Sequence, residues 1–113
     1  MTADELLSRL RDLDAELHSG RVTAFYRSQD EATRARFVGL RGWVSAALAD
    51  ATYARLDDLA DDLARNDAAL QRGFTDVRDA IARLGDANRA LDVVADVLTV
   101  LSVAIPGIID RAT

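Results

Sequence analysis

The sequence contains few of the residues that mark cross-links, metal sites and turns. None of its 113 residues is cysteine, which excludes disulfides and thiolate metal sites. Its single histidine, His18, has no second histidine or cysteine to complete a metal site, so we interpret it as a helix-end residue. One proline and 5% aromatic residues leave alanine and leucine dominant, and this composition predicts an all-helical fold.

Lysine is also absent, and the 14 basic residues, all arginine, face 19 acidic ones. The net charge of -5 disfavours a nucleic-acid partner. We expect no secretory signal, because the first segment carries early acidic residues and no long apolar run. The uncharged run over residues 97–109 has 13 residues, whereas a bilayer span needs roughly 20, so we expect a soluble cytoplasmic protein.

The most apolar stretch of the chain is Ala90–Ile109. One stripe at helical spacing runs along it, formed by Leu91, Val94, Leu98, Leu101, Ile105 and Ile108. That stripe is wider than one partner helix covers, because it is flanked by Val93, Val97, Val100 and Ala104. A helix with such a face needs the centre of a bundle, a subunit interface or a membrane around it.

A capping signal predicts where the first helix begins. Thr2 and Glu5 have the spacing of a capping box, and Gly20 is expected to end the helix. The segment 21–27 is interpreted as a connector or an extra helical turn. The buried stripe of the first helix is expected to be Leu6, Leu10, Leu13 and Leu17.

The second predicted helix opens at Ser28 and Glu31, which repeat the capping-box spacing. Its expected stripe is Phe37, Leu40, Val44, Leu48 and Ala51. Small residues beside this stripe predict a close helix crossing here, namely Gly39, Gly42, Ala46 and Ala49.

A seven-residue repeat follows, which indicates coiled-coil-like packing, at Leu56, Leu63, Leu70, Val77, Leu84, Leu91, Leu98 and Ile105. Gly85 and Asp86 interrupt it with turn chemistry, and we expect the chain to fold back there. The junction near residues 50–52 stays open, either as a break or as one continuous helix.

These patterns predict an all-α fold, a three- or four-helix antiparallel bundle in a single domain over residues 1–113. The helices are expected near residues 3–19, 29–50, 53–84 and 87–105. The third, about 32 residues and roughly 48 Å long, would be coiled-coil-like and longer than the fourth at about 28 Å. Because part of its seam would then lack a partner, we expect a homodimer or a protein partner.

No arrangement of residues points to catalysis. The acidic pairs Asp57–Asp58 and Asp61–Asp62 lack the glycine and closing glutamate of a calcium loop, and we interpret them as a solvated helix face. Phosphate-binding, nucleophile-elbow, zinc-protease and di-iron motifs are absent from the sequence. We therefore expect no enzyme activity, no metal and no cofactor.

The sequence favours a non-enzymatic helical interaction module, such as an adaptor, a chaperone or a neutraliser of a partner protein, that also self-associates. The partner or oligomer interface is expected to use Trp43, Val93, Val97, Val100, Leu101 and Ile105. The alternative is a membrane-active protein that exposes residues 97–109 on assembly.

Overall fold

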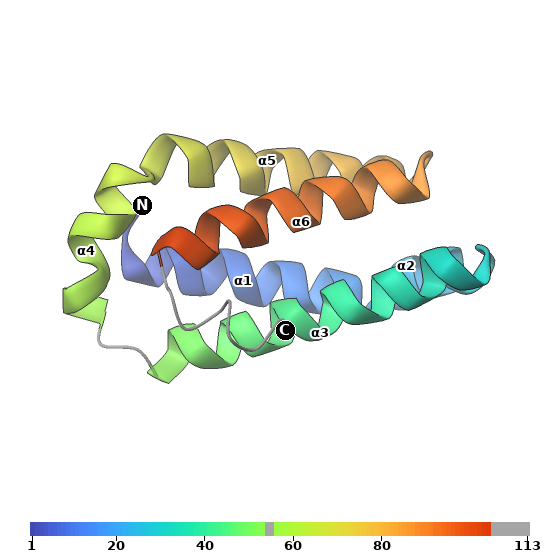
Figure 1. Cartoon of the computed structure of the whole chain (residues 1–113), viewed down its shortest axis with the longest axis horizontal. Coiled ribbons are helices and arrows are strands. Elements are labelled where there is room, and N and C mark those ends of the chain that lie inside the picture. Colours follow the sequence, from blue (N-terminus) through green and yellow to red (C-terminus); the bar gives the residue numbers. More distant parts are fainter. Residues whose placement is uncertain (54–55, 105–113) are drawn as a thin grey trace.

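The computed structural model describes residues 1–53 and 56–104, and over these residues the chain is all-helical, as the composition predicted. No strand occurs in that part of the chain. The elements, labelled in Figure 1, are α1 (Ala3–Leu17), α2 (Gly20–Arg27), α3 (Glu31–Tyr53), α4 (Leu56–Arg65), α5 (Asp67–Arg83) and α6 (Ala87–Ala104).

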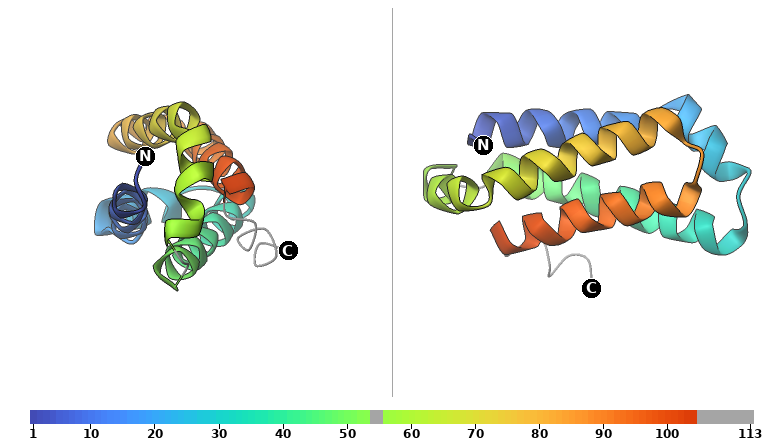
Figure 2. Two further views of the ribbon diagram at one scale, coloured as in Figure 1. Left: turned by 90° about the vertical axis from the view of Figure 1, so that its left-hand side faces the viewer. Right: turned by 90° about the horizontal axis from the view of Figure 1, so that it is seen from above.

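The long helices α1, α3, α5 and α6 lie side by side in a body of 42 × 25 × 19 Å. Seen end-on in Figure 2, their order around the bundle is α1, α3, α6 and α5. α2 extends the bundle at one end, and α4 crosses the opposite end from α3 to α5 (Figures 1 and 2). This crossing makes α3 and α6, which are packed neighbours, run in the same direction rather than antiparallel.

α1 begins as predicted but ends earlier. The Glu5 backbone N–H donates to Thr2 Oγ1 at 3.1 Å, and every leucine of the predicted stripe is buried. The expected end at Gly20 is wrong. The hydroxyl of Ser19 accepts a hydrogen bond from the Val22 N–H at 3.3 Å and caps a separate helix, α2, which begins at Gly20.

α3 also begins at a different cap from the predicted one. The Asp30 carboxylate accepts a hydrogen bond from the Thr33 N–H at 2.8 Å, and this bond lowers the pKa of Asp30. Ser28 instead donates its hydroxyl to the Phe25 carbonyl at 2.7 Å, at the end of α2. A carboxylate directly before the first turn therefore replaces the capping box expected from Ser28.

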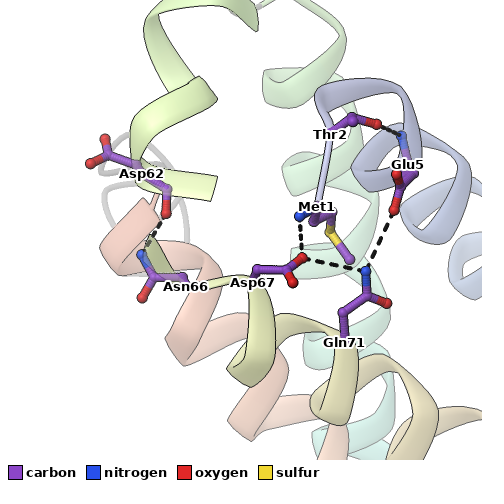
Figure 3. Close-up of polar contacts among 7 residues, drawn as sticks. All are labelled: Met1, Thr2, Glu5, Asp62, Asn66, Asp67 and Gln71. Atoms are coloured by element: carbon purple, nitrogen blue, oxygen red, sulfur yellow. Dashed lines mark hydrogen bonds and ion pairs between the residues drawn. The ribbon is translucent and has the colours of Figure 1, made fainter. Parts of the chain in front are cut away.

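The prediction of one long third helix over residues 53–84 is not confirmed, because α4 and α5 are separated at Asn66. The backbone of Asn66 has φ -103° and ψ 10°, and its side-chain amide donates to the Asp62 carbonyl at 2.8 Å (Figure 3). α4 therefore turns across the bundle end, and the long seam without a partner does not arise. Residues 54–55, at the other open junction, lie outside the described residues.

The turn predicted at Gly85 and Asp86 is confirmed. α5 ends at Arg83, and Leu84 takes the left-handed conformation with φ 41°. The Asp86 carboxylate then accepts a hydrogen bond from the Arg89 N–H at 3.1 Å in the first turn of α6.

The closest helix contact revealed by the glycines lies between α5 and α6. A Cβ atom placed on Gly73 would lie 2.5 Å from Val97 Cγ2, closer than van der Waals contact allows. The crossing expected at Gly39 and Gly42 of α3 is wrong, because nothing lies within 4 Å of a Cβ at either position. The missing side chain at Gly73 thus lets α6 settle against α5.

Candidate functional site

The predicted interface residues fall into three environments. Val97 and Leu101 are 1% and 0% exposed, so the chain's own helices cover them. Trp43, Val93 and Val100 are half-buried and pack against the core from its edge. Ile105 lies outside the described residues.

These residues come from two helices. Arg36 donates to the Asp92 carboxylate at 2.6 Å, which marks the side of α6 that reaches α3. Val93 and Val100 lie about 40° and 60° around α6 from Val97, on the flank between Val97 and Asp92. Trp43 is on α3, seven positions after Arg36 and on the same face, so the predicted set is divided between α3 and α6.

Within the described residues, α6 leaves less apolar surface exposed than the sequence indicated. Among the described residues, the exposed large apolar side chains are Val38 (55%), Tyr53 (88%) and Val103 (68%). Tyr53 ends α3 and Val103 is in the last turn of α6, and both helices end at the side of the bundle that α4 crosses (Figures 1 and 2). The most exposed apolar side chains therefore lie at one end of the bundle, which we call the α4 end.

The second candidate site is a cleft of about 460 Å³ between α1 and α5, with α2 at its edge. Its floor consists of core residues that retain 2–5% exposure, namely Leu13, Phe74, Val77 and Ile81. Its rim consists of charged and small residues, namely Arg9, Asp12, Ala15, Glu16, Ser19, Arg21, Arg78 and Ala82. The sequence pattern did not reveal this site, because it depends on which two helices remain apart.

Polar contacts close both ends of the α1–α5 seam. At one end, shown in Figure 3, Gln71 donates to Glu5 and Asp67 at 3.5 and 3.4 Å, and the amino group of Met1 pairs with Asp67. This amino group lowers the pKa of the Asp67 carboxyl. Toward the other end, Arg21 of α2 donates to the Ile81 carbonyl of α5 at 3.0 Å. The cleft lies beyond the first of these contacts and includes the second, because Arg21 and Ile81 both line it.

His18 and Arg65 have structural contacts within or at the end of their helices. His18 Nδ1 lies 2.8 Å from the Asp14 carbonyl at the end of α1, where the sequence placed it. Arg65 pairs with Asp62 at 2.7 Å. Within residues 1–53 and 56–104, no group of three or more histidines and carboxylates is placed to hold a metal ion. No helix in the same part of the chain is long and apolar enough to cross a membrane.

Comparisons with known proteins give no match, whether with family models, curated sequences or solved structures. The function must therefore be argued from the surfaces of this chain.

Proposed function

We propose that this protein is a non-enzymatic helical interaction module that self-associates through the α4 end of its bundle. The observation that carries the proposal is the exposure of Tyr53 and Val103, at 88% and 68%, where α3 and α6 end. Burying such side chains is worth roughly 25 cal/mol per Å² of apolar surface, so a protein partner that covers them gains stability.

The sequence stays apolar after Val103, with Ile105, Ile108 and Ile109, which lie outside the described residues. The proposed interface is centred on different residues from the predicted one. Val97 and Leu101 are buried in the core, and the side chains of Trp43, Val93 and Val100 are only partly exposed.

Light scattering after size exclusion tests the proposal. The wild type is expected to form a dimer or larger assembly, and the double variant Tyr53→Ser/Val103→Gln is expected to be a folded monomer. Val38→Gln is the matched control, because Val38 is 55% exposed but lies in the first half of α3, away from the α4 end. A monomeric wild type at 100 µM contradicts the proposal, as does an assembly that Val38→Gln disrupts equally well.

The membrane-active alternative uses the same apolar end and is separated by liposome flotation. Co-flotation of the wild type, lost in Tyr53→Ser/Val103→Gln, favours insertion of this end at a lipid surface. Self-association without flotation favours the protein interface.

A further inference from the structure

We propose that the α1–α5 cleft binds a small amphipathic monoanion, a carboxylate with an extended apolar body. The apolar body would lie over Leu13, Phe74 and Ile81, and the carboxylate would meet Arg9 and Arg78 on the opposite walls. This inference is independent of self-association, because the cleft and the α4 end involve different residues.

The rim of the cleft carries more arginines than acidic residues. Glu16 and Arg21 lie 4.0 Å apart and balance each other. Arg9 and Arg78 have no ion pair or hydrogen bond to any side chain in the described part of the chain, and Asp12 is the one further acid on the rim. The cleft therefore has a local excess of positive charge in a protein whose net charge is -5.

The floor of the cleft is apolar and offers little open surface. Its side chains are only 2–5% exposed. A partner helix, roughly 10 Å across, needs a larger apolar surface than this floor exposes, whereas an alkyl chain or a single ring does not. The volume of about 460 Å³ lies in the range of small-molecule pockets.

Polar contacts are found toward both ends of the seam. Gln71 and Ile81 take part in them, and the step of ten positions from one to the other spans about 15 Å of α5. This spacing limits the length of the ligand. Since neither end contact uses Arg9 or Arg78, both guanidinium groups stay available to a carboxylate.

The probe is decanoate, compared with decanol and decyltrimethylammonium at the same concentrations, by isothermal titration calorimetry and by amide chemical shifts. We expect decanoate to bind more tightly than either, with shifts concentrated on α1 and α5. Arg9→Gln and Arg78→Gln are each expected to weaken decanoate binding about tenfold. Arg72→Gln is the matched control, because Arg72 is an exposed arginine of the same helix outside the cleft.

Ala82→Phe gives a test that leaves every charge in place, because Ala82 is an exposed residue on the rim. A phenyl ring there is expected to fill the cleft and abolish decanoate binding without loss of helix signal. The proposal is overturned if decanoate does not bind the wild type, or if decanol binds as tightly. It is equally overturned if binding survives Ala82→Phe, or if the shifts map to the α4 end.

Discussion

The two sides of α5 differ in how they meet their neighbours. On one side, Gly73 faces Val97 of α6 so closely that a single added carbon atom would lie 2.5 Å from it. On the other side, Phe74 and Ile81 face α1 across a cleft of about 460 Å³. One helix can thus seal one seam of a bundle and leave the next seam open, depending on whether a small residue lets the backbones approach.

The largest expected effect comes from placing a charge in the sealed seam. Val97→Asp should destabilise the protein by about 3 kcal/mol or more, because a buried carboxylate must lose its hydration or take up a proton. Val103→Asp, on the same helix but 68% exposed, should change stability by less than about 0.5 kcal/mol. Urea unfolding measures both, and equal losses would show that Val97 is not sealed.

Alkaline pH should weaken the contact of α2 with α3 and with the first residue of α6, Ala87. The Tyr26 hydroxyl donates to the Ala87 carbonyl at 3.0 Å, and its ring stacks on Phe37 with centroids 4.3 Å apart. Burial raises the pKa of Tyr26 from 10.0 to about 12, although Arg36 opposes the shift. The folded state favours the neutral phenol, so its contribution to the free energy of unfolding is fully present below pH 10. As the pH rises from 10 to 12, the protein should lose about 2 kcal/mol of stability.

The measurement is urea unfolding at several pH values, with Tyr26→Phe as the control. The phenylalanine variant should lose this dependence on pH while keeping the ring packed on Phe37. If Tyr26→Phe kept the same pH dependence, groups other than Tyr26 would cause the loss of stability at alkaline pH.

A smaller effect is expected from adding one methyl group to each of two glycines. Gly73→Ala should destabilise the protein by about 1 kcal/mol, because overpacking against the stiff Val97 side chain exceeds the gain in helix propensity. Gly39→Ala should stabilise α3 by about 0.5–1 kcal/mol, because its Cβ meets nothing within 4 Å. Thermal unfolding of both variants checks the opposite signs, and a stabilising Gly73→Ala would mean that α5 and α6 are not in close contact.

The smallest effect on stability is expected in the open seam. Arg78→Gln should change the free energy of unfolding by less than about 0.5 kcal/mol, because no ion pair of the described residues involves this guanidinium. Urea unfolding beside Arg72→Gln checks this value. If Arg78→Gln alone clearly lowered the stability, the Arg78 guanidinium would be making a structural contact and would not be available to a ligand.

The sequence was sufficient to predict the features that follow from the local spacing of residues. The leucine stripe of α1 and the turn at Gly85 and Asp86 follow from local spacing, and both are found. The helix N-caps were harder to predict, because neighbouring polar residues compete for the same backbone N–H groups of the first helical turn. Asp30 starts the helix that the pattern assigned to Ser28, and Ser19 starts α2, where a connector or an extra helical turn was expected. Asn66 interrupts a heptad repeat that continues through it.

The sites were not predictable in the same way, because they depend on which helices become neighbours. Gly39 and Gly73 are both helical glycines in the sequence, and only the packing of α6 on α5 makes the second one essential. The same holds for Val97, whose apolar face suggested a subunit contact until α5 covered it. The cleft needs α1 and α5, which are far apart in the sequence, and no local pattern contains that pairing.

Thiol reactivity can show whether the bundle is sealed between α5 and α6 and open between α1 and α5. The chain has no cysteine, so Ile81→Cys in the cleft floor and Val97→Cys in the sealed seam each provide a single thiol. With Ellman's reagent under native conditions, the Ile81→Cys thiol should react at a rate that low urea barely changes. The Val97→Cys thiol should react only through unfolding, at a rate that rises steeply with urea. The same steep dependence in both variants would contradict this arrangement, because it would show that α1 and α5 close over the floor.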